Sequence, residues 1–232
     1  MGCEYGAGMS ALLEVIVVDA ADAVAAQEGG ADRLELVRDR RADGLTPDPA
    51  TVRSVLAATD LPVRVMIRDD TGFAAGDVDG LRRSAARVRE AGAREFVLGF
   101  LDDHGQVDVG ATRDVTAELR GCPWTFHRAV DHAAQYRMAW NHAVSLGPDA
   151  VLTAGGPDGV DEGLGALREI AGQQDIEEVT LLVGGGLRAE HVPDLREAGV
   201  FAFHVGSAVR AGSGTGPVLA DEVRAWRSLV DA

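Results

Sequence analysis

Four predicted helices end in similar glycine-containing segments, and each segment leads directly into an apolar run typical of a buried strand. The segments are Glu28–Arg33, Glu90–Glu95, Leu146–Ala150 and Glu197–Val200. A glycine at the end of a helix readily adopts the left-handed backbone conformation that stops it. The recurring segment therefore indicates one repeated connection from helix to strand, and it restricts the chain to a parallel sheet covered by helices.

Along the chain, apolar runs alternate with segments of helical periodicity, which gives eight strand–helix units. The expected strands are Leu12–Val18, Arg33–Val37, Val63–Ile67, Glu95–Leu101, Pro123–Val130, Ala150–Thr153, Val179–Val183 and Val200–Val205. No segment has the composition of a domain linker. The units favour a single-domain α/β fold, a closed (β/α)8 TIM barrel over residues 11–232, after a flexible extension at residues 1–10. An open Rossmann-like sheet is the alternative, but Val18-Asp19-Ala20 stands where its glycine-rich turn would follow the first strand.

The charge and the cysteines exclude several classes of partner. The chain carries a formal net charge of −15, and Cys3 and Cys122 are its two cysteines. Because such an acidic chain repels nucleic acid and acidic membranes, we expect neither as a partner. The cysteines lack metal-ligand spacing, so the residues alone predict no metal site and no cofactor. The sequence has no apolar span of about 18 residues and no signal segment, which predicts a soluble cytoplasmic protein.

Two glycine-rich turns follow the last two expected strands. They are Gly184-Gly185-Gly186 and Gly206-Ser207. In (β/α)8 barrels the loops after strands seven and eight commonly bind phosphate through backbone N–H groups. We therefore expect an anion site at these turns, and the alternative is that the glycines only allow tight connections.

Isolated polar residues interrupt the apolar strands. Glu14 lies in LLEVI and Glu35 in RLELV, and each buried carboxylate needs a partner, for which we expect Arg68 or His127. Inward polar side chains near the carboxyl ends of barrel strands line the active-site mouth. We therefore predict that Glu14, Glu35 and His127 are catalytic, the alternative being a structural layer of salt bridges. The residues expected to bind substrate are Arg68, Arg128, Asp131, Gly185, Gly186, His204, Gly206 and Ser207.

The same segments resemble the CutC family, whose members are called copper homeostasis proteins. The resemblance covers about residues 11–210 and rests on GADRLEL, TFHRAVD, VLTAGG, GGGLRAE and FHVGSA, in that order. It implies a (β/α)8 barrel that works in the cytoplasm as a homodimer or higher homo-oligomer. Copper is implied by the family name only. Cuprous ion prefers thiolates, and Ile16, Val17 and Val37 stand where the family has cysteines in strand one and at the end of strand two.

Three functional hypotheses remain open from the sequence. The first is an enzyme of the lyase or isomerase type that uses acid/base chemistry on a small phosphorylated or carboxylated metabolite. Glu14 or Glu35 would be its base, His127 the partner of that base, and Arg68 and Arg128 the groups that hold the anion. The second is a copper-binding protein without catalysis. A barrel that has lost its activity is a third, which predicts that no ligand stabilises the fold.

Overall fold

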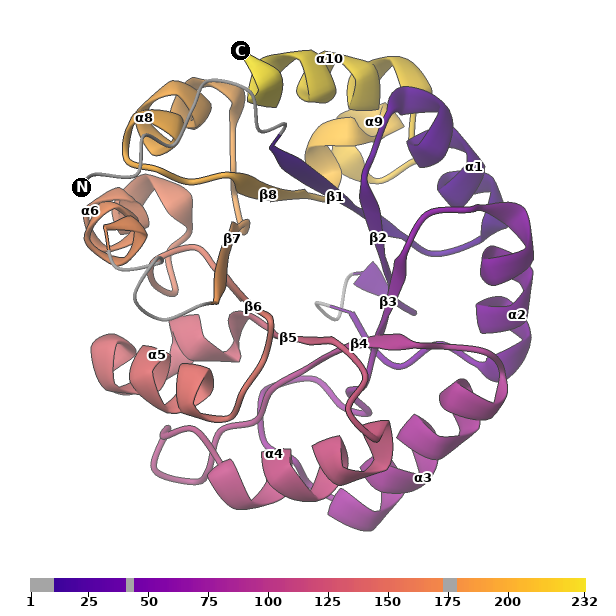
Figure 1. The fold of residues 1–232 in the computed structure, drawn as a ribbon, viewed down its shortest axis with the longest axis vertical. Coiled ribbons are helices and arrows are strands. Elements are labelled where there is room, and N and C mark those ends of the chain that lie inside the picture. Colours follow the sequence, from indigo (N-terminus) through magenta and orange to yellow (C-terminus); the bar gives the residue numbers. More distant parts are fainter. Residues whose placement is uncertain (1–10, 41–43, 173–178) are drawn as a thin grey trace, which may run out of the picture.

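The computed structural model describes residues 11–40, 44–172 and 179–232. Its parallel strands form a closed barrel in chain order, completed by pairing of the last strand with the first (Figure 1). The strands are β1 (Leu12–Val17), β2 (Arg33–Leu36), β3 (Val63–Met66), β4 (Glu95–Leu98), β5 (Trp124–Phe126), β6 (Ala150–Thr153), β7 (Thr180–Val183) and β8 (Ala202–Val205). This confirms the (β/α)8 prediction, and the closure excludes the open sheet. The predicted extension at residues 1–10 lies outside the described residues.

Helices surround the ring of strands (Figure 1). They are α1 (Ala20–Gly29), α2 (Pro49–Ala58), α3 (Val78–Glu90), α4 (Val109–Thr116), α5 (Tyr136–Ser145), α6 (Val160–Ala171), α8 (Val192–Glu197), α9 (Ala211–Gly214) and α10 (Ala220–Asp231). The recurring glycines have the left-handed conformation that the repeat predicts, with φ of 91° at Gly30, 116° at Gly92, 79° at Gly147 and 94° at Gly199. In the part of the chain that the structure describes, no helix combines the length and apolarity needed to cross a membrane.

The fifth strand is shorter than the sequence predicts. It ends at Phe126, whereas the predicted strand continues to Val130. His127 stops it, because Nδ1 of its ring accepts a hydrogen bond of 3.1 Å from the backbone N–H of Ala129. This contact caps the 3-10 helix η3 (Arg128–His132). The strand therefore delivers His127 at its carboxyl end and turns Arg128 away from the sheet.

Side-chain alternation divides the interior into two regions. Leu13, Val15 and Val17 point outward into the main core between the strands and the helices. Inside the barrel, two small apolar clusters are separate from that core: Val37, Met66 and Val97 form one, and Leu152, Leu182 and Ala202 form the other. Several buried charged side chains share the barrel interior, namely Glu14, Arg33, Glu35 and Arg64. Because charged groups are costly to bury, this interior is where function is expected.

The contact between α6 and the end of β6 gives a first prediction. A Cβ atom at Gly163 would lie 1.8 Å from the backbone oxygen of Ala154, whereas one at Gly165, also in α6, would meet nothing within 4 Å. We expect Gly163→Ala to lower the free energy of unfolding by about 1–3 kcal/mol or more. Gly165→Ala is the matched control and should raise it by about 0.5–1 kcal/mol. Urea unfolding of both variants measures this, and equal effects would contradict the packing described.

Candidate active site

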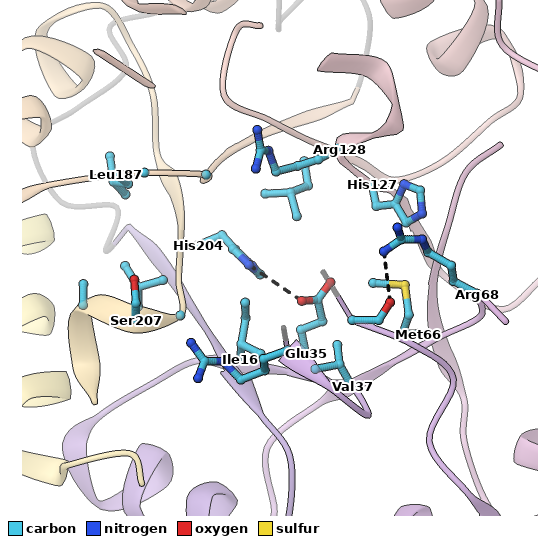
Figure 2. Close-up of a pocket in the computed structure, with 18 of the residues that line it drawn as sticks. Ile16, Glu35, Val37, Met66, Arg68, His127, Arg128, Leu187, His204 and Ser207 are labelled. Carbon is cyan, nitrogen blue, oxygen red and sulfur yellow. Dashed lines mark hydrogen bonds and ion pairs between the residues drawn. The ribbon is translucent and has the colours of Figure 1, made fainter. Parts of the chain in front are cut away.

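A cavity of about 270 Å³ opens at the carboxyl ends of the strands (Figure 2). Its apolar wall includes Ile16, Val37, Met66, Leu152 and Leu187. Of the eleven site residues predicted from the sequence, nine line this cavity: Glu35, Arg68, His127, Arg128, Gly185, Gly186, His204, Gly206 and Ser207. Glu14 and Asp131 do not line it, although both are buried. Residues spread over most of the sequence therefore meet at one end of the barrel.

Glu35 lies at the centre of the cavity wall and points into it (Figure 2). Its carboxylate is buried, with Oε2 3.7 Å from Nε2 of His204, while Oε1 has no hydrogen-bond partner. Burial raises the pKa of Glu35 to about 7, helped by the negative charge of Glu14 and opposed by His204 and Arg33. A carboxyl group with this pKa exchanges a proton readily near neutral pH.

Glu14 is buried within the barrel and does not line the cavity. Oε2 accepts a bond of 2.5 Å from Arg33 Nε, and Oε1 lies 2.7 Å from Nδ1 of His204. Burial by itself would raise the pKa of Glu14, but Arg33 and His204 outweigh it and hold the pKa well below its usual range. The expected partners, Arg68 and His127, are therefore wrong for this carboxylate.

Sequence reasoning missed Arg33 although a signal was present. Arg33 precedes Glu35 by two positions, and period-two alternation puts both side chains on the same face of β2. The register then sets Arg33 directly beside Glu14 of β1. Arg64 of β3 was missed in the same way; it is buried, its Nε donates to Glu95 over 3.2 Å, and it contacts Thr125 and Asp149.

His127 lines the cavity and carries a hydrogen-bond donor without a partner. Its Nδ1 accepts the Ala129 N–H, so the neutral ring carries its proton on Nε2. That Nε2 is buried without a partner. Burial and the nearby Arg68 charge lower the pKa of His127 to about 3, so the ring is neutral at physiological pH. A neutral N–H beside a cavity can polarise a carbonyl oxygen of a bound molecule.

Arg128 is the cation held at the cavity mouth. Its Nε donates over 2.8 Å to Oδ2 of Asp131, and its side chain is 29% exposed. Asp131 is fixed in turn by the Thr153 hydroxyl and the backbone N–H of Ala154. A Cβ atom at Gly185 would lie 2.5 Å from the guanidinium carbon of Arg128, so a glycine there lets the cation settle against the loop. Asp131 thus orients Arg128 and does not reach the cavity itself.

Arg68 and Gly206 have structural contacts as well as lining the cavity. Arg68 Nε donates to the backbone oxygen of Gly72 over 2.9 Å, and its guanidinium carbon lies 4.9 Å from the centre of the Phe73 ring. It thereby fastens the loop after β3 and places Phe73, which sequence reasoning missed, against the cavity. At Gly206 a Cβ atom would lie 2.8 Å from Cδ1 of Ile16. Close packing therefore accounts for this glycine.

The donor set of the cavity fits a copper ion poorly. Within residues 11–40, 44–172 and 179–232, no three His, Cys, Asp or Glu side chains are grouped so as to hold a metal ion. His204 directs both ring nitrogens at carboxylates, and Nδ1 of His127 already accepts a backbone N–H. Met66 supplies a thioether to the wall, whereas Cys122 is not among the lining residues. Cys3 lies outside the described residues.

Comparison with known proteins finds a matching family model and several relatives. Residues 11–209 match the model of the CutC family. The family protein CutC of Enterobacter sp. (strain 638) is 34% identical over 197 residues, covering 84% of this chain and 79% of the relative. The corresponding protein of Xanthomonas campestris pv. campestris (strain 8004) is 34% identical over 212 residues, covering 90% and 85%.

Solved structures share the fold. A CutC protein from Streptococcus agalactiae, named for copper homeostasis, has a TM-score of 0.76 and 23% identity, covering 84% of this chain and 97% of that one. Thiamine phosphate pyrophosphorylase from Pyrococcus furiosus has a TM-score of 0.62 and 19% identity, covering 95% and 97%. The latter likeness concerns the barrel alone. The family model and the relatives together show that this chain belongs to the CutC family.

Proposed function

We propose that this protein is an enzyme of the isomerase or lyase type that moves a proton on a small phosphorylated or carboxylated metabolite. One observation carries the proposal: two buried atoms without partners, Glu35 Oε1 and His127 Nε2, belong to residues that line the same cavity. An unpaired buried polar atom is costly, and a bound substrate would satisfy both. The first is a proton acceptor when ionised, and the second is a donor.

The chemistry follows from these two atoms. The carboxylate of Glu35 removes a proton from a carbon next to the substrate carbonyl, and the electron pair of that C–H bond moves onto the carbonyl oxygen. The N–H of His127 donates to this oxygen and stabilises its developing negative charge. In an α-hydroxy carbonyl substrate, the hydroxyl proton then passes to the former carbonyl oxygen, and the protonated Glu35 returns its proton to the former carbonyl carbon, which gives isomerisation. In a lyase, Glu35 instead takes the hydroxyl proton of a β-hydroxy carbonyl substrate, the adjacent carbon–carbon bond breaks to leave an aldehyde and the enolate, and Glu35 returns the proton to the enolate carbon.

Arg128 is the proposed holder of the substrate anion. Its guanidinium remains partly exposed at the mouth while Asp131 fixes its direction. The backbone beside it is formed by Gly185 and Gly186, and no side chain there competes for space. An arginine held in this way binds a phosphate or carboxylate group through paired hydrogen bonds.

A thermal-shift screen against triose to pentose phosphates and small hydroxy and oxo acids tests binding. A compound present at about 100 times its Kd stabilises the native state by about 2.7 kcal/mol, which raises the Tm by about 5–10 °C for a chain of this size. Arg128→Met should weaken binding of the best compound about 10- to 100-fold, because a charged hydrogen bond is lost. The matched control, Arg168→Met, removes an exposed ion pair with Asp194 and should leave the affinity unchanged. No stabilising compound, or equal affinity in both variants, would contradict the proposal.

Copper binding without catalysis is the competing function, and it rests on the name of the relatives. Metal analysis of protein purified in the presence of copper separates the two. The proposal expects no stoichiometric copper. Stoichiometric copper that disappears in a His127→Asn variant would replace it.

We further propose that the protein acts in the cytoplasm as a homodimer or higher homo-oligomer, and that nucleic acid is not a partner. The net charge of −15 supports the latter. Size-exclusion chromatography with light scattering measures the oligomeric state, and a monomeric mass would contradict the proposed homo-oligomer.

A further inference from the structure

Four buried groups form a continuous row across three neighbouring strands, β2, β1 and β8. Arg33 Nε lies 2.5 Å from Glu14, Glu14 lies 2.7 Å from Nδ1 of His204, and Nε2 of His204 lies 3.7 Å from Glu35. Cross-strand register sets Glu14 directly beside His204. The row begins at the buried Arg33 and Glu14 and ends at His204 and Glu35, which line the cavity (Figure 2).

The two oxygens of Glu14 are both engaged within the row. Oε2 faces Arg33 and Oε1 faces His204, and Glu14 does not line the cavity. Glu14 therefore acts on a substrate only through the histidine. Since it stays ionised, it accepts the Nδ1–H of His204 and so fixes both the plane of the ring and the direction of its other nitrogen.

The orientation of the ring decides which oxygen of Glu35 is available. Nε2 of His204 faces Oε2 of Glu35 at an ion-pair distance, whereas Oε1 has no partner. One oxygen of Glu35 therefore faces the histidine, and the other is buried without a hydrogen-bond partner. The arrangement resembles the logic of a carboxylate that orients a histidine beside a reacting group.

Resting on the function proposed above, we propose that Glu14 and His204 are positioning residues for Glu35. Glu14 orients the ring, and the ring holds the Glu35 carboxylate in place and shares its proton. When the two groups approach to hydrogen-bond distance, the Nε2–H bond of the imidazolium breaks and an O–H bond forms on Glu35, which leaves a neutral ring and a neutral carboxyl group. His204 and Glu35 thus form one unit with two states, an ion pair and a pair of neutral groups.

Charged groups from four strands act on Glu35. They are Glu14 on β1, Arg33 on β2, Arg64 on β3 and His204 on β8. Burial and Glu14 raise the pKa of Glu35, whereas the three cationic groups lower it. For His204, burial lowers the pKa, but the carboxylates of Glu35 and Glu14 outweigh burial and raise it. Removing either partner therefore has a predictable sign.

NMR titration of protein labelled with 13C in Glu carboxyl groups and 15N in histidine rings tests the proposal without a substrate. In the wild type, the Glu35 and His204 signals should share their inflections, since coupled groups titrate as a pair. His204→Gln should raise the pKa of Glu35 by more than about one unit, because burial is then less opposed. Glu14→Gln should lower the pKa of His204 by more than about one unit, because a paired carboxylate is lost.

His191→Gln is the matched control. His191 is also buried beside a carboxylate, with Nε2 2.8 Å from Asp161, but it does not line the cavity. This variant should leave both titrations unchanged. An unchanged Glu35 titration in His204→Gln would overturn the positioning role, while binding in the thermal-shift screen would still support the proposed function. If neither variant folds, the wild type decides, because separate and independent inflections of Glu35 and His204 contradict the proposal.

Discussion

Replacing Arg33 with methionine is expected to lower the free energy of unfolding by about 3–5 kcal/mol at neutral pH. The side chains of Arg33 and Glu14 are 8% and 1% exposed, so the change leaves a buried carboxylate without its main cation. Because the pKa of Glu14 is lowered in the fold, this contribution is complete above its ordinary value of 4.5 and is lost as the pH falls. Urea unfolding at several pH values measures it.

Two further variants identify the cause of that loss. Adding Glu14→Gln to Arg33→Met removes the stranded charge and should recover most of the stability. Arg82→Met removes an ion pair with Glu118 whose arginine is 44% exposed, and it should cost less than about 1 kcal/mol. Additive losses in the double variant, or equal losses at Arg33 and Arg82, would contradict the buried row.

Glu35→Gln is expected to lower the rate of substrate proton transfer by about 10²- to 10⁴-fold, the usual loss when a general base is removed. The amide has nearly the same shape and cannot accept the proton. The measurement is hydrogen exchange on a compound selected by the thermal-shift screen, followed by NMR in D2O. Glu190→Gln, at an exposed ion pair with Arg188, is the control and should retain the wild-type rate.

Glu35→Gln should also stabilise the fold at alkaline pH. The pKa of Glu35 is raised from 4.5 to about 7, so its favourable contribution is present below pH 4.5 and is lost as the pH rises through 7. At about 1.4 kcal/mol per unit, Glu35→Gln gains up to about 3 kcal/mol relative to the wild type above pH 7. A variant that is more stable yet inactive is what a functional carboxyl group predicts.

Much of the fold could be predicted from the sequence because each unit repeats local information. Apolar runs mark the strands, and glycines such as Gly30 and Gly199 end the helices before them. Among the strands, β5 departs furthest from its predicted end, because His127 bonds to the backbone two residues on. Such a side-chain contact competes with the ladder and leaves no trace in hydropathy.

Most members of the candidate site were predictable from the sequence, whereas their pairing was not. Alternation places Glu35 and His127 at the carboxyl ends of strands, where they indeed line one cavity. The cation that pairs with Glu14 is set by the register between β1 and β2, and a single sequence does not specify that register. The protonation state of His127 could not be predicted from the sequence either, because burial and the charge of Arg68 decide that its ring is neutral.

The dependence of substrate hydrogen exchange on pH tests the central claim most directly, namely that Glu35 is the base of this cavity. The compound is the best stabiliser from the screen, and the rate is followed from about pH 5 to about pH 9. We predict that kcat/KM rises with pH through an inflection near 7, where Glu35 ionises, and that the exchange disappears in Glu35→Gln. A rate that shows no inflection in this range, or that persists in Glu35→Gln, would contradict the claim.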